Sequence, residues 1–281
     1  MGKHLFGLLT AACLLFALAA PADAQVFINE IMANPPGSDN GFEFIELRST
    51  TPSLSLSGLH LLIIEGDGAN AGIIDQALNL GALSTGTNGL FLWRDSSTVL
   101  VPPPSPATFV HVADFVPDIE NGAQTYLIVQ SFTGSVGDDL DTNNDGILDS
   151  TPWAAVIDAI GVRESGTGGT VYGAHLGFAD FPNTLLFTPD LIFRVSGTNA
   201  WVGADVNGTS PGPYDFDPAE LVDIFGNPLS LSEFDITTAT PGSANPVPEP
   251  SLVAIVAVGM TGAVYRQWRR RRSRAPKQAR K

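Results

Sequence analysis

Val26-Phe27-Ile28-Asn29-Glu30-Ile31 is followed by the turn-forming tetrapeptide Asn34-Pro35-Pro36-Gly37 and then by Phe42-Glu43-Phe44-Ile45-Glu46-Leu47-Arg48. Both apolar-rich runs contain the β-branched and aromatic residues that favour strands, and the proline and glycine residues between them favour a turn. Two such runs separated by a turn predict two neighbouring β-strands. This strand–turn–strand pattern indicates the fold class of the chain.

The same alternation of short β-rich runs and turn residues continues along the chain. Gly66-Asp67-Gly68, Pro102-Pro103-Pro104 and Glu120-Asn121-Gly122 are among the breakers, and the chain contains 29 glycines and 21 prolines. Helical periodicity is confined to a single turn at 218–222, so the pattern predicts an all-β, antiparallel sandwich and not βαβ units. The expected strands are 26–31, 42–48, 59–65, 90–93, 109–112, 125–130, 155–162 and 191–195.

Six short segments between residues 29 and 245 share a pattern with a known family. They are Asn29-Glu30-Ile31, Glu43-Phe44-Ile45-Glu46-Leu47, Leu56-Ser57-Gly58-Leu59, Gly122-Ala123-Gln124-Thr125-Tyr126-Leu127, Val156-Ile157-Asp158-Ala159 and Thr240-Pro241-Gly242-Ser243-Ala244-Asn245. These segments resemble the lamin tail domain. The resemblance implies an immunoglobulin-like antiparallel β-sandwich over residues 25–245, and a binding or scaffolding module rather than an enzyme. The stretch 166–231 exceeds a minimal sandwich, so it is an insertion, a set of extra strands or a small second subdomain.

The charge of the chain is unevenly distributed. Residues 25–247 contain 27 acidic residues, four arginines and no lysine, a formal charge of −23. Nucleic-acid affinity depends largely on cations that displace condensed counterions, so this region is not expected to bind nucleic acid. A strongly negative surface favours solubility in an exposed compartment.

The first 24 residues have the parts of a secretory signal peptide. Lys3 and His4 form a short basic region, residues 5–20 are almost wholly apolar, and Ala22-Asp23-Ala24 provides an A-x-A cleavage site. Gln25 is therefore the expected mature N-terminus. Cys13, the only cysteine, lies in the removed part without a lipobox before it, so no disulfide is expected.

The last 36 residues, 246–281, have a different three-part pattern. Pro248-Glu249-Pro250 precedes an uncharged, mostly apolar run at 251–265, and nine basic residues follow it. The apolar run is expected to be a membrane helix with the arginines on the cytoplasmic side. This arrangement resembles the PEP-CTERM sorting signal, which implies recognition and cleavage near the Pro-Glu-Pro by an exosortase-type membrane protease.

We expect no catalytic residue. Gly208-Thr209-Ser210-Pro211-Gly212 matches the G-x-S-x-G motif, but Pro211 has no N–H for an oxyanion hole and no apolar strand is expected to lead into Gly208, so we interpret the match as a turn. His60, His111 and His175 lack metal-ligand spacing, and the first two are expected in hydrogen-bonded structural roles. Glu43 and Glu46 are predicted to point to opposite faces of one strand, so they cannot share a pocket.

One segment has the spacing of a calcium loop. Counted from Asp141, its oxygen ligands fall at the first, third, fifth and ninth positions, Gly146 supplies a turn at the sixth, and a backbone carbonyl serves at the seventh. Position twelve is Pro152 instead of a bidentate Glu, so this is not an EF-hand, and we expect a weak Ca²⁺ site with Kd on the order of 10⁻⁴–10⁻³ M. Asp138 or Asp139 supplies the missing oxygen. The predicted metal residues are Asp139, Asp141, Asn143, Asp145, Ile147 and Asp149.

These observations together indicate an exported, acidic binding or structural protein. We expect transient anchoring in the inner membrane by the C-terminal helix, followed by a cell-surface or extracellular location. The expected partners are an exosortase-type protease, the membrane before processing, and extracellular polysaccharide or envelope proteins. The alternative is a secreted hydrolase with a site built from carboxylates, or an accessory module to one.

Overall fold

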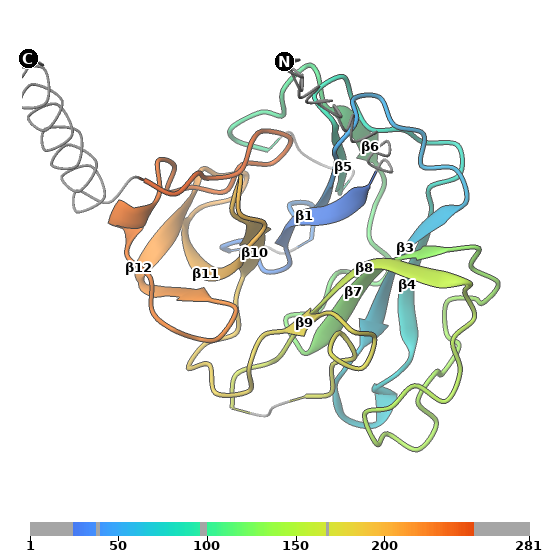
Figure 1. Ribbon diagram of the computed structural model, residues 1–281. Helices are drawn as coiled ribbons and strands as arrows, with labels where there is room; N and C mark the ends of the chain where they lie inside the picture. Colours follow the sequence, from blue (N-terminus) through green and yellow to red (C-terminus); the bar gives the residue numbers. More distant parts are fainter. Residues whose placement is uncertain (1–24, 38–39, 96–99, 167–168, 250–281) are drawn as a thin grey trace, which may run out of the picture.

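A computed structural model describes residues 25–37, 40–95, 100–166 and 169–249, which form two β-sheets (Figure 1). The expected signal peptide, with Cys13, Ala22 and Ala24, and the expected membrane run at 251–265 lie outside the described residues. Within them, no helix has the length and apolar character needed to cross a membrane. The elements are β1 (Val26–Met32), β2 (Phe44–Ser49), β3 (Leu59–Glu65), η1 (Gly68–Asn70), β4 (Ile74–Asn79), β5 (Leu90–Arg94), β6 (Phe109–Val112), β7 (Gln124–Gln130), β8 (Ala155–Val162), β9 (Ala179–Asp180), β10 (Leu191–Arg194), β11 (Trp201–Gly208), β12 (Tyr214–Asp223) and η2 (Leu231–Glu233).

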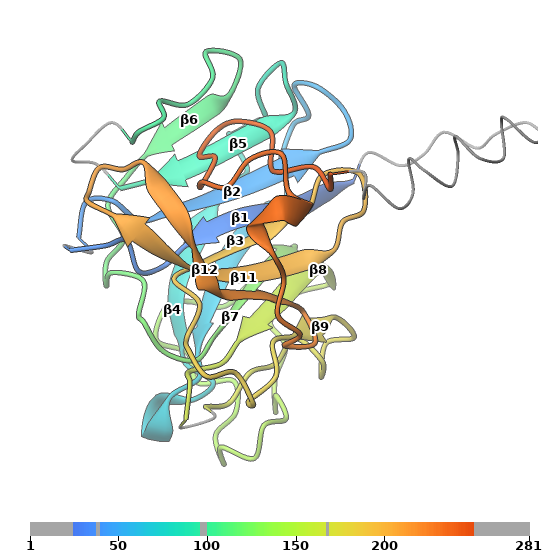
Figure 2. The same ribbon diagram turned by 90° about the vertical axis from the view of Figure 1, so that its left-hand side faces the viewer.

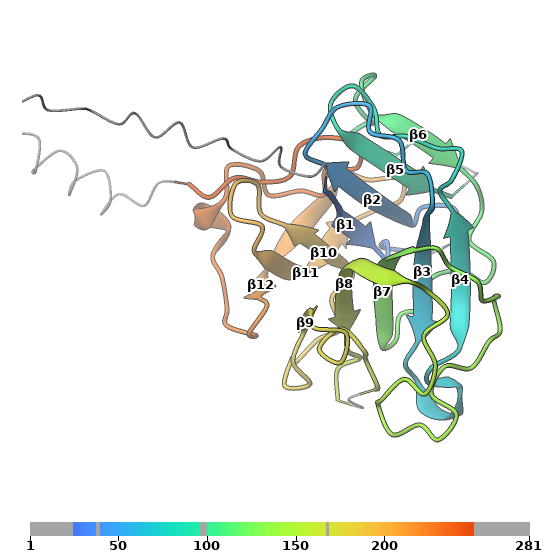
Figure 3. The same cartoon turned by 45° about the vertical axis from the view of Figure 1, so that its right-hand side comes forward.

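The larger sheet has the strand order β12-β11-β10-β1-β2-β5-β6, and the smaller sheet has the order β4-β3-β7-β8-β9. Figure 3 shows β4, β3, β7 and β8 side by side. The all-β class and the two-sheet arrangement are as the sequence predicts. The expectation of an antiparallel sandwich is wrong at two edges, because β5 pairs with β6 and β8 pairs with β9 in parallel.

All eight predicted strands are present, while β4, β9, β11 and β12 were not predicted. The expected helical turn at 218–222 is wrong, because these residues belong to β12. The long stretch 166–231 contributes strands to both sheets, and β10 pairs directly with β1 through Glu30 and Phe193. The strands of this stretch therefore belong to the same two sheets as the N-terminal strands.

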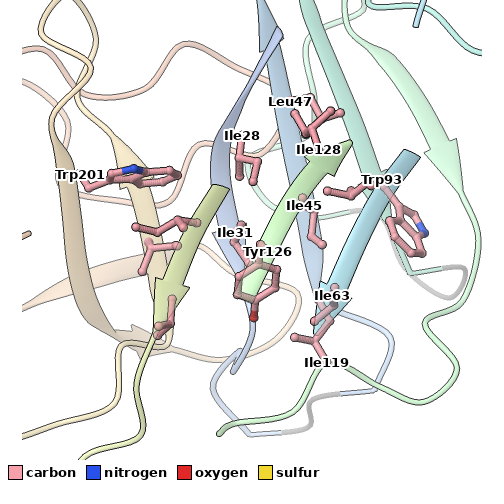
Figure 4. Packing of buried hydrophobic residues seen from close by; sticks show 14 of the residues in the cluster. Ile28, Ile31, Ile45, Leu47, Ile63, Trp93, Ile119, Tyr126, Ile128 and Trp201 are labelled. Carbon is pink, nitrogen blue, oxygen red and sulfur yellow. The ribbon is translucent and has the colours of Figure 1, made fainter. Parts of the chain in front are cut away.

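The space between the two sheets holds the main hydrophobic core (Figure 4). Ile45 and Leu47 of β2 point into it with Ile63 of β3 and Ile128 of β7, and all four are completely buried. Trp93 stacks on Phe115 with ring centroids 4.2 Å apart. Burial of apolar surface on this scale is the main term that stabilises the contact between the sheets.

Both sheets are also covered on their outer faces. Phe44, Phe193 and Phe216 of the larger sheet pack under Phe234 and Ala239 of the C-terminal segment, which crosses this face in Figure 2. On the smaller sheet, a second apolar cluster lies under loops 131–154 and 170–178. A strand buried on both faces needs apolar residues at successive positions, which explains the uninterrupted Leu-Leu-Ile-Ile of β3.

One ion pair connects the two sheets. The Arg194 guanidinium of β10 lies 2.8 Å from the Asp158 carboxylate of β8, and their side chains are only 12% and 5% exposed. Asp158 also accepts a hydrogen bond from Ile28 N of β1. Arg194 stacks over the Trp201 ring at 4.2 Å, so its charge is stabilised on two sides.

A β-bulge at Asn29 starts a buried network that we call the clasp, formed by Asn29, Glu30, Glu46, Thr240, Gly242 and Asn245. The register between β1 and β2 shifts between Ile28 and Glu30, and Glu30 then lies opposite Glu46. Asn29 Nδ2 donates to Glu46 Oε1 at 2.5 Å and to Asn245 Oδ1 at 2.9 Å. A bulge reorients a side chain in this way without breaking the sheet.

The remaining donors of the clasp come from the C-terminal segment. Thr240 donates its N–H and its hydroxyl to the two carboxylate oxygens of Glu30, each at 2.8 Å. Gly242 N donates to Glu46 Oε2 at 2.7 Å. Asn245 Nδ2 donates to the carbonyls of Asn29 and Arg194, both at 2.9 Å. The last part of the domain is thereby attached to its first hairpin.

The two clasp carboxyls carry less negative charge in the folded protein than they would in water. Burial raises the pKa of Glu30 from 4.5 to about 7, partly offset by the hydrogen bonds from Thr240. Burial and the neighbouring Glu30 raise the pKa of Glu46 well above its ordinary value, against the bonds from Asn29 and Gly242 and the charge of Arg48. The folded state therefore holds protons that the unfolded chain releases near pH 4.5.

We predict that this pair makes the protein less stable as the pH rises. Its stabilising contribution is complete below about pH 4.5 and decreases as the pH rises through 7, because the folded state binds more protons than the unfolded state in that window. Glu46→Gln should reduce the loss of unfolding free energy between pH 5 and pH 8 by roughly 1 kcal/mol or more, since one proton held over one pH unit is worth about 1.4 kcal/mol. Urea denaturation at the two pH values measures this difference. The exposed Asp215→Asn serves as the control, and an identical pH slope in wild type and Glu46→Gln would contradict the prediction.

Candidate functional site

The predicted calcium loop covers the outer face of the smaller sheet at the edge of β4. Ile74 N donates to Asp138 O at 3.0 Å, and Leu140 N donates to Gly72 O at 2.9 Å. Leu140 and Leu148 are both buried in the apolar cluster on this sheet. The loop is therefore fixed at both of its ends by side chains that the fold requires to be buried.

Asp141, the first ligand position, is completely buried. Its Oδ1 accepts from Asp145 N at 3.1 Å, and its Oδ2 accepts from Gly146 N and from the Tyr172 hydroxyl, both at 2.9 Å. A buried carboxylate needs such donors or a cation to offset its lost hydration. The three donors fix the orientation of this carboxylate within the loop.

The residues at the third and fifth positions are hydrogen-bonded to each other. Asn143 Oδ1 accepts from Asp145 N at 3.0 Å, the same N–H that Asp141 accepts, and Asn143 Nδ2 lies 3.2 Å from Asp145 Oδ2. Gly146 has φ +83°, a left-handed conformation that suits glycine, as the predicted turn requires. The structure thus brings together Asp141, Asn143 and Asp145.

The other predicted ligands are arranged differently. Asp149 Oδ2 accepts from the N–H and the hydroxyl of Thr142, at 2.9 and 2.6 Å. Asp139 Oδ1 accepts from Asp141 N at 3.0 Å, and the side chain of Ile147 is 55% exposed. In the described part of the chain, no three carboxylates of this loop converge to within 4.8 Å of one another, whereas two other groups of three acids do. Such convergence would require Asp149 to turn away from Thr142.

Tyr172 is the part of this site that the sequence analysis missed. It lies 31 positions from Asp141 and is completely buried. Burial and the nearby carboxylates of Asp141, Asp139 and Asp145 raise the pKa of its hydroxyl, so it stays a hydrogen-bond donor. No local spacing links it to the loop, because the contact arises only when loop 170–178 packs on the same sheet.

The two convergent groups of acids come from segments far apart in the sequence. They are Glu65, Asp75 and Glu120, and Glu43, Asp95 and Asp118. Their only sequence signal is that Glu65 and Glu120 adjoin breaker clusters, which become neighbours because β3 and β7 pair with Glu65 opposite Gln124. To predict these groups from the sequence, one would have had to know how β3 and β7 are aligned.

The first group lies at the end of β3. Glu65 Oε1 accepts from the N–H groups of Gly66 and Asp67, at 2.9 and 2.6 Å. Burial is the main reason that the pKa values of Glu65, Asp75 and Glu120 are all raised, and their mutual repulsion adds to the effect. This group therefore has an affinity for protons, and by the same physics for cations.

Glu43 and Glu46 belong to different sites, as predicted. Glu46 lies in the clasp, on the face of the larger sheet that carries Phe44. Glu43 precedes β2 and approaches Asp95, which accepts from Gly41 N at 2.7 Å. The two glutamates therefore do not share a pocket.

Gly208-Thr209-Ser210-Pro211-Gly212 forms the turn between β11 and β12, as interpreted from the sequence. The expectation that no strand leads into Gly208 is wrong, because β11 ends there. The Ser210 hydroxyl donates to Pro36 O at 3.0 Å and accepts from the Tyr214 hydroxyl at 3.2 Å. Both contacts hold the serine in a structural role.

The three histidines are dispersed. His60 of β3 packs on Phe132 with centroids 5.3 Å apart, and its buried Nδ1 has no hydrogen-bond partner among the described residues, so the expected hydrogen-bonded role is wrong at this atom. His111 of β6 lies near the Phe91 ring at 6.3 Å. Burial lowers the pKa of both imidazoles. His175 is exposed.

Of the predicted sorting residues, Pro248 and Glu249 are described and exposed, whereas Pro250, Ala22 and Ala24 lie outside the described residues. Comparisons with known proteins return no matching family model, no matching curated protein and no matching solved structure. The residues and their geometry are therefore the basis of the functional argument.

We predict that Tyr172→Phe lowers the free energy of unfolding by about 1.5–3 kcal/mol, the range for a hydrogen bond to a charged group. The substitution removes the donor to Asp141 and leaves the ring in place. Chemical denaturation measures the loss. In a double-mutant cycle with Asp141→Asn, the two losses should not add, because they share one interaction. Additive losses would contradict a functional contact between the two side chains.

Proposed function

We propose that this chain is an exported, acidic binding or structural protein of the cell surface or extracellular matrix. The lamin-tail resemblance implies an all-β, two-sheet architecture, and the two sheets support that part of it. The six lamin-tail-like segments are the basis on which we propose an immunoglobulin-like fold. All six of those segments contribute residues to strands or to the clasp. Interaction modules of this kind act through surfaces and not through catalysis.

We further propose that loop 138–149 binds Ca²⁺ weakly. The observation that carries this proposal is the wholly buried Asp141 carboxylate, whose Oδ1 shares the Asp145 N–H with Asn143 Oδ1, so that these two oxygens lie near one point of the loop. Carboxylate, amide and carbonyl oxygens are the ligands that Ca²⁺ prefers. A cation here would offset the repulsion among the loop carboxylates and hold the loop against the sheet that Leu140 and Leu148 cover.

Titration of the full-length chain in detergent micelles should show Ca²⁺ binding with Kd on the order of 10⁻⁴–10⁻³ M. A saturating excess of about 100 Kd should raise the free energy of unfolding by roughly 2.7 kcal/mol. Asp141→Ala/Asp145→Ala should abolish both effects, and the exposed Asp215→Ala on β12 should retain them. Equal binding heats in wild type and in the double variant would refute the site. Ca²⁺ would then bind elsewhere, and the two other groups of acids would be the next candidates.

The second candidate function is a secreted hydrolase with a carboxylate site. The group Glu65, Asp75 and Glu120 favours it, because converging carboxyls with raised pKa values are candidates for general acid–base catalysis. The nearest described cavity, which Glu120 lines but Glu65 and Asp75 do not, holds about 20 Å³, room for roughly one water molecule. A substrate needs a much larger cleft, so the binding function is the better supported of the two.

The C-terminal pattern supports sorting by an exosortase-type protease, with transient anchoring in the inner membrane and then a surface or extracellular location. Deleting Pro248-Glu249-Pro250 should leave the protein in the membrane fraction and abolish its surface display or release. Cell fractionation followed by immunoblotting measures this outcome. A deletion of Gly134-Ser135-Val136 provides a control of equal length in an exposed loop. Unchanged display after loss of the Pro-Glu-Pro would refute the sorting function.

A further inference from the structure

The segment 246–249, which includes the first two residues of the sorting motif, lies against residues 233–235 and 196 of the domain. Pro248 forms an antiparallel bridge with Phe234. Asp235 N donates to Val247 O at 3.2 Å, and Ser196 N donates to Pro246 O at 2.9 Å. The described part of the motif is therefore held to the fold by hydrogen bonds.

Prolines alternate through this segment, at 246, 248 and 250, so only Val247 and Glu249 have a backbone N–H. Alternate residues of an extended chain direct their N–H groups to the same edge. Val247 N donates to Asp235 Oδ1 at 2.6 Å, and Glu249 N donates to Glu233 O at 2.7 Å. Both donors of the segment are thus used by the domain.

The surface that receives them is rigid. Phe234 is only 8% exposed and meets the Phe193 ring edge-on, with centroids 6.0 Å apart. The turn before it is stabilised by a capping box in which Ser230 accepts from the backbone and Ser230 N donates to Glu233 Oε1. The segment 246–249 is thus held on a well-packed surface by the two hydrogen bonds that it donates and the two that it accepts.

We propose that the folded domain restrains its own processing, because the strand 247–249 has to detach from 233–235 before a protease can engage the Pro-Glu-Pro. This inference rests on the proposed sorting function. A protein that binds an extended peptide as an added strand does so through main-chain hydrogen bonds. The edge opposite the two donors has proline carbonyls but no N–H, so a protease that pairs with main-chain donors of the motif has to take the two that Asp235 and Glu233 now hold.

The position of the motif strengthens this constraint. Only Pro250 separates the docked Glu249 from the apolar run that begins at Ser251. A residue of extended chain spans at most about 3.6 Å, so a docked strand leaves almost no free chain between the domain and the expected membrane segment. Detachment supplies that length.

Amide hydrogen exchange of the full-length chain in detergent micelles, read by NMR at Val247 and Glu249, tests the docking without any protease. Both amides should be protected in the wild type. Asp235→Ala removes one acceptor and should speed exchange at Val247 by about two- to tenfold, the effect expected from one hydrogen bond. Asp235→Asn keeps an Oδ1 acceptor and should stay closer to the wild type.

Processing is then followed in membranes that contain the exosortase-type protease. Asp235→Ala should be processed faster by a similar factor, and Asp235→Asn should again resemble the wild type. Unprotected amides in the wild type would overturn the docking, and faster exchange without faster processing would overturn the restraint. If no variant is processed although the amides are protected, the proposed sorting function fails, and the restraint on it fails too.

Discussion

Two carboxylates buried on neighbouring strands need hydrogen-bond donors, and this need brings the end of the domain back to its beginning. Glu30 and Glu46 face each other across β1 and β2, where the bulge at Asn29 supplies only part of the required donors. The rest come from Thr240 and Gly242. Leaving such groups unsatisfied would cost several kcal/mol, so the larger sheet and the segment that covers it form together.

The covering segments also place the candidate sites. Phe234 and Ala239 are buried on one sheet because the clasp holds the chain that follows them, and the same path carries Val247 and Glu249 to the edge at 233–235. On the other sheet, Leu140 and Leu148 hold the acidic loop in place. Calcium binding and strand docking would each act on a layer that lies outside the central core, where local opening is least costly.

Much of the fold was predictable because its signals are local. The runs at 59–65 and 155–162 are dense in strand-forming residues and end at breakers, and the structure has strands there. β4 was missed because its Ile74-Asp75-Gln76-Ala77-Leu78-Asn79 lacks β-branched residues beyond the first. β12 contains Pro218 and two acids beside it, which resemble a helical start, and only pairing with β11 makes it a strand. Tyr172 and the two groups of acids could not be predicted because each contact joins residues from segments far apart in the sequence.

By itself the sequence determined the β class, local turns such as the one at Gly146, and the Asp/Asn spacing of the acidic loop. These features depend only on residues that are neighbours in the sequence. The tertiary structure alone decided which carboxyl groups are buried together, which side chain donates a hydrogen bond to Asp141, and how the segment Pro246-Val247-Pro248-Glu249 is bound to the domain. The alternating prolines are visible in the sequence. Only the fold shows that Asp235 and Glu233 accept the two N–H groups that remain in this segment. Contacts such as Thr240 to Glu30 span 210 positions, and no local propensity specifies an interaction at that separation.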